Sequence, residues 1–315
     1  AASDVYKRQG IRARPGKATS VRAARGAANH VTRWVPMEEQ FDLPLICIKA
    51  DNLAEGWERA VLACWEQGAA IETQYDREGD PPSRDVSLAL AVRNPFNEPR
   101  IHRALPGGIY DLEIYRQEVV LGVHDHWIAP DEGKWQYTYH ERIEAYSLPD
   151  GRVINQLDYV VDALANAPHT RRAQISIWKC WEDAGIHDPA CLQRMWFRVY
   201  GDRLVMSCHM RSNDAFKASY MNMYAFTDLQ RLVAERLGDR LGREIAVGQY
   251  NHIVDSYHIY GSYFEEMARF LETIEARTWE QRTWTMDQMQ PLIEEARERI
   301  EKHLERERER MKDGE

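Results

Sequence analysis

One thiol and a short run of polar side chains in this sequence have types and spacings that suit covalent chemistry on a nucleotide. Cys191 precedes Arg211 by twenty residues, and Asn222 follows Arg211 by eleven. A thiol reacts as its thiolate, which a neighbouring guanidinium stabilises, and the same guanidinium can bind a phosphate. The amide of Asn222 both donates and accepts hydrogen bonds, so it can pair with the edge of a base.

Further motifs flank these residues along the chain. Arg171-Arg172 opens a strand-like segment before the thiol, and His258 lies two residues before Tyr260 in a later strand-like segment. Side chains two apart on a strand face the same side, so His258 and Tyr260 could bind one ligand group together. Upstream, Glu118 lies within an expected helix.

The order and spacing of these motifs resemble the thymidylate synthase family, which includes pyrimidine nucleotide hydroxymethylases. In that family a Pro-Cys nucleophile precedes an Arg-Ser-x-Asp motif by twenty residues, and a base-reading Asn lies eleven residues beyond the Arg. The resemblance covers roughly residues 50–265. It implies an α+β fold in a single domain, with one large mixed sheet flanked by helices and a sheet face used for dimerisation.

The resemblance implies a role for each candidate residue. Cys191 would add to C6 of a pyrimidine, Glu118 would organise proton transfer, and Tyr137 would lie near C5. Arg211 would bind the phosphate and favour the thiolate, and Asp214 would contact the pterin ring of a folate. The implied ligands of the substrate's phosphate, base and sugar are Arg84, Arg171, Arg172, Ser212, Asn222, His258 and Tyr260.

Two of these implied contacts come from a second chain. In the family the paired arginines, here Arg171 and Arg172, reach across a dimer interface to the partner's phosphate. Each site would then need both chains of an isologous homodimer. Arg84 is the expected phosphate ligand from the N-terminal half, with Arg77 as its rival because the glycine–threonine loop that normally follows is missing.

The resemblance implies conversion of dUMP to dTMP, with 5,10-methylenetetrahydrofolate as the carbon donor and reductant. The sequence departs from the family at Ala190, at Leu192 and at Lys217-Ala218-Ser219, and its C-terminal stretch is charged where thymidylate synthases have a short apolar segment that closes over the folate. A less closed site admits water. Hydroxymethylation of dUMP, dCMP or CMP is therefore the alternative reaction, and a non-catalytic relative that only binds a nucleotide or a partner chain is the alternative from another class.

Several candidates also have a purely structural interpretation. A lone cysteine is often a buried apolar side chain, as we expect for Cys47, Cys64 and Cys208. Asn222 could instead cap the helix in which it lies. The amide of Asn222 would serve uracil directly and cytosine with more difficulty.

Composition narrows the class of protein. The 315 residues carry a net charge of −9, which argues against nucleic acid as the main partner. The five scattered cysteines include no C-x-x-C pair, so we expect a reducing, cytoplasmic location, and no apolar run is long enough to span a membrane. His124-Asp125-His126 has metal-binding residue types, but its spacing favours a solvated loop and no metal.

The chain divides into three expected segments. Residues 1–35 form a basic, disordered tail of possible artefactual origin, residues 36–275 a catalytic domain, and residues 276–315 a charged, solvent-exposed helix, with a coiled coil as the alternative. Periodicity predicts helices at 52–68, 111–123, 154–165, 219–237 and 263–274, and strands at 86–92, 135–146, 174–178, 195–210 and 253–259.

Overall fold

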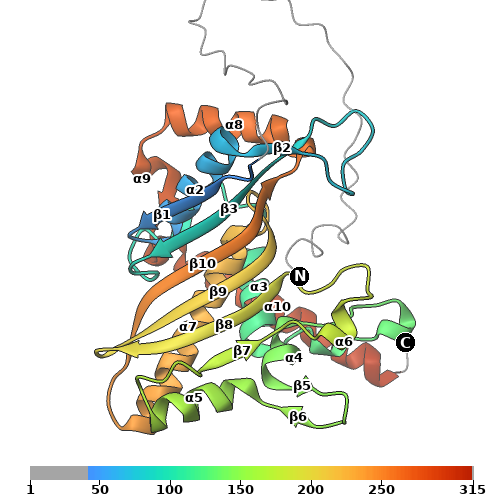
Figure 1. The fold of residues 1–315 in the computed structure, drawn as a ribbon, viewed down its shortest axis with the longest axis vertical. Coiled ribbons are helices and arrows are strands. Elements are labelled where there is room, and N and C mark those ends of the chain that lie inside the picture. Colours follow the sequence, from blue (N-terminus) through green and yellow to red (C-terminus); the bar gives the residue numbers. More distant parts are fainter. Residues whose placement is uncertain (1–41, 314–315) are drawn as a thin grey trace, which may run out of the picture.

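A large mixed β-sheet forms the centre of the computed structural model, which describes residues 42–313 (Figure 1). The strands in spatial order are β1 (Leu45–Ala50), β3 (Ser83–Val92), β10 (Ala246–Ile259), β9 (Arg203–Asp214), β8 (Leu192–Tyr200) and β7 (Gln174–Ser176), with β2 (Ala69–Ile71) paired to β3. β1 runs parallel to β3 and β9 parallel to β10, whereas the other pairs are antiparallel. The expected α+β fold with one mixed sheet is confirmed.

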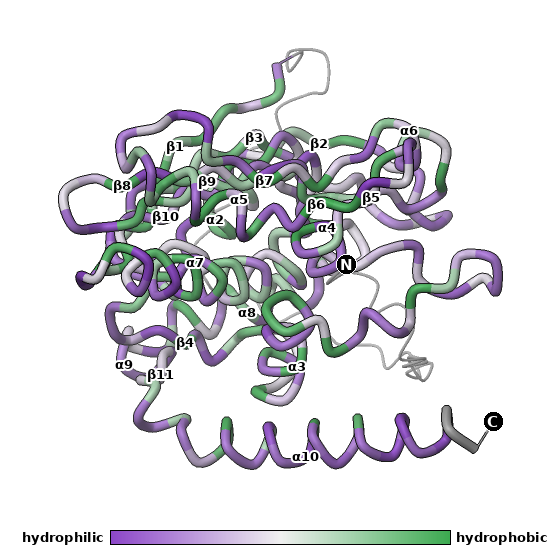
Figure 2. Tube along the Cα trace, turned by 90° about the horizontal axis from the view of Figure 1, so that it is seen from below, coloured by the Kyte–Doolittle hydropathy of each residue, from purple (hydrophilic) through white to green (hydrophobic). Residues whose placement is uncertain are grey.

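Helices pack on one face of this sheet in successive layers (Figure 2). The long α7 (Ser219–Leu241) contacts β9 and β10 and lies beside α2 (Leu53–Gln67) and α5 (Gln156–Asn166). Next, α3 (Ile109–Leu121) packs on α7, and α10 (Met286–Asp313) packs on α3. The other elements are α4 (Tyr139–Glu144), α6 (Cys180–Asp183), α8 (Phe264–Ala276), α9 (Trp279–Arg282), the pair β4 (Ile101–His102) and β11 (Thr283–Trp284), and the pair β5 (Tyr146–Ser147) and β6 (Val153–Ile154).

The first half of α7 is enclosed on all sides. Every residue from 219 to 230 is buried, because the sheet lies on one side of the helix and α3 on the other. The amide of Gln230 donates to the carbonyls of Leu204 (2.8 Å) and Gly248 (3.2 Å), which ties the helix to β9 and to the start of β10. This packing holds the N-terminal turns of α7 close to the ends of the two central strands.

The opposite face of the sheet carries no helix within residues 42–313 (Figure 2). Along β9, Leu204, Met206 and Cys208 are buried toward the helices, whereas Val205 and Ser207 between them are partly exposed. This alternation is typical of a sheet that is covered on one side only. Use of the open face in a dimer stays a prediction.

Most of the expected elements are confirmed, and one is wrong. The expected helices correspond to α2, α3, α5, α7 and α8, and the expected strands at 86–92, 174–178, 195–210 and 253–259 correspond to β3, β7, β8 with β9, and β10. Half of the expected strand at 135–146 is instead the helix α4. Thr138 begins that helix by accepting the backbone N–H of Glu141 (2.9 Å), and the buried Arg142 anchors it through an ion pair with Asp183 (3.2 Å).

The C-terminal helix is not exposed on all sides, so that expectation is wrong for one face of α10. Apolar side chains recur at helical spacing along it and are buried against the rest of the protein: Met289, Ile293, Ala296, Ile300 and Leu304. Arg297 adds an ion pair to Glu113 of α3 (2.9 Å). The mixed charges predicted a helix exposed to solvent on all sides, whereas these apolar residues form one buried face.

The remaining expectations concern the termini and the membrane. The basic tail, residues 1–35, lies outside the described residues. The three-segment division of the chain stays a prediction. None of the described helices is long and apolar enough to cross a bilayer.

Candidate active site

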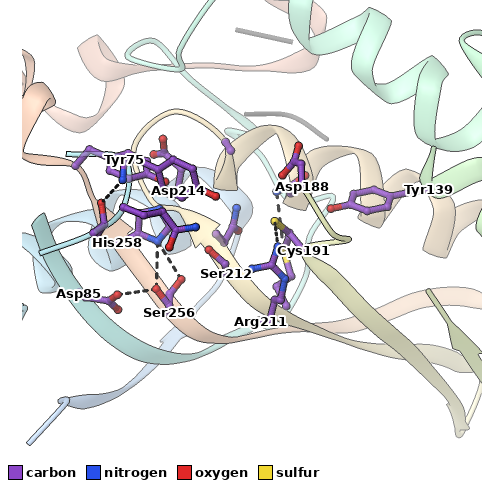
Figure 3. A pocket seen from close by; sticks show the side chains of 17 residues that line it. Tyr75, Asp85, Tyr139, Asp188, Cys191, Arg211, Ser212, Asp214, Ser256 and His258 are labelled. Carbon is purple, nitrogen blue, oxygen red and sulfur yellow. Dashed lines mark hydrogen bonds between the residues drawn. The ribbon is translucent and has the colours of Figure 1, made fainter. Parts of the chain in front are cut away.

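A cavity of about 270 Å³ opens where the carboxyl ends of β9 and β10 meet the start of α7 (Figure 3). These two strands are parallel and adjacent, so their last residues reach the same edge of the sheet. Cys191, immediately before β8, and Asp85, near the start of β3, complete the wall from the neighbouring strands. Residues from six separate segments therefore line one cavity: 73–75, 85, 139, 188–191, 210–222 and 256–260.

The thiol of Cys191 and the guanidinium of Arg211 lie side by side in this cavity. β8 pairs with β9 in the antiparallel sense, so the backbone N–H of Arg211 donates to the carbonyl of Cys191 (2.9 Å). Arg211 Nη2 lies 3.7 Å from Cys191 Sγ, and the same nitrogen donates to the carbonyl of Pro189 (2.7 Å). A fixed positive charge at this distance favours the thiolate.

The other buried thiols differ in their surroundings. Cys64 and Cys208 are fully buried, and burial raises the pKa of both thiols because it disfavours the charged form. Cys191 is only half-buried and lines the cavity. Of these three cysteines, only Cys191 combines access to a ligand with a neighbouring guanidinium.

A tyrosine that the sequence interpretation missed lies beside the thiol. Tyr139 lines the cavity, and its hydroxyl accepts the backbone N–H of Leu192 (3.2 Å). Burial raises the pKa of Tyr139 well above its ordinary value, so the hydroxyl keeps its proton. Tyr137, the residue chosen from the sequence, is not part of the cavity wall, and its ring packs against Tyr139 and the Arg142 guanidinium.

Asn222 enters the cavity from inside α7. The helix begins at Ser219 after Ala218, whose carbonyl accepts the backbone N–H of Asn222 (3.0 Å), so Asn222 is not the helix cap. Its Oδ1 accepts a hydrogen bond from the hydroxyl of Tyr115 on α3 (2.5 Å). Both side chains are buried. Sequence reasoning found Asn222 and missed Tyr115, since only the packing of α3 on α7 brings the two together.

Polar groups from β3 and from the end of β10 line the other end of the cavity (Figure 3). Ser256 and His258 at the end of β10 and Tyr260 just after it alternate toward the cavity, and Asp85 on β3 lies opposite His258 in the strand register. The hydroxyl of Ser256 donates to Asp85 Oδ2 (2.6 Å). Continuing the same alternation by two residues would have identified Ser256, whereas Asp85 needs the β3–β10 register.

Two expected residues of β9 lie between these ends. Ser212 lies opposite Ser256, and Asp214 opposite His258, in the register of β9 with β10. Asp214 Oδ1 accepts the backbone N–H groups of Phe216 (3.0 Å) and Lys217 (2.8 Å), which fixes the turn into α7. Burial raises the pKa of Asp214. Its carboxylate, on the cavity wall, has the chemistry to hold N–H groups of a heterocycle.

The remaining expected residues lie outside the cavity wall. Glu118 is buried in α3, with its Oε2 3.0 Å from Nδ1 of His124. Arg84 donates to the carbonyl of Gly68 (3.2 Å). Arg171 and Arg172 are exposed just before the edge strand β7.

The solvated loop that the sequence predicted at His124-Asp125-His126 is wrong for His124, whereas His126 is exposed. His124 is buried, and its ring stacks on that of Trp127 with centroids 3.8 Å apart. The aromatic ring and the Glu118 carboxylate together exclude water from this histidine. Across residues 42–313, no group of three or more His, Cys, Asp or Glu side chains is arranged to hold a metal ion.

Comparison with known proteins identifies the family. A family model described as thymidylate synthase matches residues 111–292, which include the candidate nucleophile and most of the cavity wall. The chain belongs to the thymidylate synthase family. The part of the cavity wall contributed by Thr73, Gln74, Tyr75 and Asp85 precedes the matched segment.

Relatives within the thymidylate synthase family are distant. The chain is 26% identical over 219 residues to a Methanosarcina acetivorans protein named "Putative thymidylate synthase", covering 70% of this chain and 94% of that protein. A protein of the same name from Methanocaldococcus jannaschii is 24% identical over 241 residues, with 72% and 100% covered. The structure of thermostable thymidylate synthase A from Bacillus subtilis shares the fold with a TM-score of 0.53 at 20% identity, covering 70% of this chain and 84% of that one.

Proposed function

We propose that this protein transfers a one-carbon unit from 5,10-methylenetetrahydrofolate to C5 of a pyrimidine nucleoside monophosphate, with dUMP converted to dTMP. The observation that carries the proposal is the half-buried Cys191 thiol, 3.7 Å from the Arg211 guanidinium, in a cavity whose wall also carries Asn222. A nucleophile, a phosphate ligand and a base-reading amide are thus offered to one small molecule.

The proposed chemistry starts at the thiolate. Cys191 Sγ bonds to C6 of the base, and the C5–C6 π electrons move toward C5 and O4, so C5 becomes nucleophilic. C5 bonds to the one-carbon unit of the folate, and C5 then loses its proton while the carbon–nitrogen bond to the folate breaks, which leaves an exocyclic methylene on C5. Hydride from the released tetrahydrofolate adds to this methylene and gives the methyl group and dihydrofolate, and elimination of Cys191 restores the ring and the thiolate. The folate supplies both the carbon and the hydride that completes the methyl group. Tyr139, protonated and next to the thiol, is the group we assign to proton handling near C5.

The other polar groups of the wall bind and orient the nucleotide. Arg211 and Ser212 take the phosphate, Asn222 takes the base, and His258 with Tyr260 takes the sugar hydroxyl. Asp214 lies where its carboxylate can accept from the pterin. Glu118 does not line the cavity, so we assign it an indirect role through Tyr115, one helical turn away, whose hydroxyl contacts Asn222.

A homodimer with shared sites is part of the proposal. The open face of the sheet exposes apolar area at Trp196 and Ile253, both only half-buried in a single chain. Arg171 and Arg172 are exposed at the β7 edge and do not line the cavity of their own chain, as a contribution to a partner's site requires. An isologous contact through this face would bring each pair toward the other chain.

Release of tritium from C5 tests this function. The chain is incubated with [5-³H]dUMP, with and without 5,10-methylenetetrahydrofolate, and tritiated water is measured. Folate-dependent release is expected, since the C5 proton leaves only after the new carbon–carbon bond has formed. Absence of release from dUMP, dCMP and CMP would contradict the enzymatic function and leave a nucleotide-binding relative.

One observation favours hydroxymethylation as a second candidate. Among the described residues, none after Tyr260 lines the cavity, and α10 packs on α3 instead of covering it. Water could then reach the exocyclic methylene before hydride does. The product would be a 5-hydroxymethylpyrimidine nucleotide together with tetrahydrofolate.

A further inference from the structure

The amide of Asn222 has a defined partner on each side. Tyr115 donates its hydroxyl hydrogen to Asn222 Oδ1 (2.5 Å), and Asn222 Nδ2 approaches the sulfur of Met210 (3.9 Å). A hydroxyl suits the carbonyl oxygen, and a thioether, which is a weak acceptor, suits the NH₂ group. Two independent neighbours therefore specify the same orientation of the amide.

Rotating the amide by 180° would make its contacts with both neighbours unfavourable. Oδ1 would then face the sulfur of Met210, which is another acceptor, and the Tyr115 hydroxyl hydrogen would lose its acceptor. Tyr115 is 1% exposed, so water does not replace that acceptor. A buried donor without a partner is costly. The phenol thus holds the amide in one of its two orientations.

The orientation of this amide decides which base it fits. Uracil presents an acceptor at position 4 and a donor at N3, whereas cytosine presents a donor at position 4 and an acceptor at N3. The free edge of a fixed amide, one oxygen lone pair and one N–H, matches one of these patterns and opposes the other. The orientation of the amide therefore determines which of the two bases is bound.

We infer that Tyr115 is a positioning residue that sets the choice between uracil and cytosine by holding the Asn222 amide in one orientation. This inference rests on the proposed function, in which the cavity binds a pyrimidine nucleotide. Tyr115 lies behind Asn222 and does not line the cavity. It acts on the base only through the amide.

The test compares nucleotide preference in wild type and in Tyr115→Phe, which deletes only the hydroxyl. Dissociation constants for dUMP and dCMP are measured by calorimetry, together with kcat/KM for C5 tritium release. Wild type should prefer one base, uracil under the proposed function. Tyr115→Phe should reduce the preference, measured as the ratio of the dUMP and dCMP values, by about 5- to 150-fold, which corresponds to about 1–3 kcal/mol. If Tyr115 had a purely structural role, the substitution would weaken the binding of both nucleotides equally.

Two control variants distinguish the effect of the Tyr115 hydroxyl from the effects of other changes near it. Tyr110→Phe removes a hydroxyl from the same helix, where the ring packs under Arg299 with its centroid 4.8 Å from the guanidinium carbon, and should leave the ratio unchanged. Met210→Leu removes only the weak acceptor and should keep the ratio within about threefold. If it narrows the ratio as much as Tyr115→Phe does, packing rather than the phenol holds the amide, and the inference fails.

The remaining outcomes are also decisive. An unchanged ratio in Tyr115→Phe, or equal binding of the two nucleotides by wild type, overturns the inference. A preference for cytosine corrects the proposed substrate, but the inference stands if Tyr115→Phe narrows that preference. If Tyr115→Phe does not fold, a crystal structure of wild type with dUMP decides, and a Tyr115 hydroxyl more than about 3.5 Å from Asn222 Oδ1 rejects the inference.

Discussion

At the scale of single residues, reactivity in this protein depends on what surrounds a side chain. Cys191 immediately precedes β8 and Cys208 lies on the adjacent strand β9, but Cys208 is fully buried and Cys191 lies in a cavity 3.7 Å from a guanidinium. The first environment disfavours a thiolate and the second favours it. The same residue type therefore lies in two opposite environments within one pair of neighbouring strands.

Substituting serine for each of these two cysteines should have different effects on turnover and on stability. Cys191→Ser should abolish tritium release and leave dUMP affinity within about tenfold, because the hydroxyl is a far poorer nucleophile and the binding groups remain. Cys208→Ser, the matched control, should keep turnover and lose some stability. Calorimetric dUMP binding and tritium release measure the two effects. Equal loss of turnover in both variants would show that Cys191 is a structural thiol.

At the scale of elements, a buried histidine adds a side-chain link between the paired strands β9 and β10 beside the cavity. Nε2 of His252 donates to Asn213 Oδ1 (2.9 Å), and its Nδ1 accepts from the hydroxyl of Tyr250 (2.8 Å). In this arrangement Nδ1 carries no proton and the ring is uncharged. Burial lowers the pKa of His252 to about 3, since there is neither water nor a counter-charge for the imidazolium.

His252 should make stability depend on pH. Its pKa is lower in the folded chain than the ordinary value of about 6.5, so its contribution is complete above that pH and is lost as the pH falls. The free energy of unfolding should drop by about 1.4 kcal/mol per pH unit between about pH 6 and 5, measured by urea unfolding. His252→Gln, which keeps hydrogen-bonding groups but does not titrate, should show a shallower slope. Parallel slopes in the two proteins would assign the effect to other groups.

Sequence reasoning found the elements and residues that follow from local pattern. Helix α2 is marked by its Asn52 cap, and His258 and Tyr260 by strand alternation. Residues that meet through tertiary packing were not found. Tyr115 reaches Asn222 because α3 packs on α7, and Tyr139, the first residue of α4, lines the cavity whereas Tyr137, before the helix, does not.

At the scale of the whole molecule, the open sheet face and the paired arginines make a prediction about two chains. Arg172→Ala and Cys191→Ser should each be inactive or impaired alone. Mixed after denaturation and refolding, they should form heterodimers with one intact site, restoring about a quarter of wild-type activity for random pairing. Tritium release with dUMP measures the recovery. No gain on mixing would mean that Arg172 serves its own chain or none.

The cover of the cavity makes a second prediction at this scale. If α10 stays packed on α3 during turnover, water competes with hydride at the methylene intermediate, and some tetrahydrofolate and hydroxymethyl product should form beside dihydrofolate and dTMP. Near-ultraviolet absorbance distinguishes the folates, and mass spectrometry the nucleotides. Dihydrofolate in full stoichiometry with a methylated base would show that the site closes.

The placement of the cysteines gives the unmodified chain a set of internal alkylation reporters. Cys47 is exposed on the open sheet face and Cys180 on α6, Cys191 is partly accessible in the cavity, and Cys64 and Cys208 are buried. With a neutral alkylating agent, Cys180 sets the reference rate. Bound nucleotide should slow labelling at Cys191 and chain association should slow it at Cys47, whereas labelling at the buried pair should wait for opening of the fold. One peptide mass spectrum would then record occupancy, association and local unfolding simultaneously.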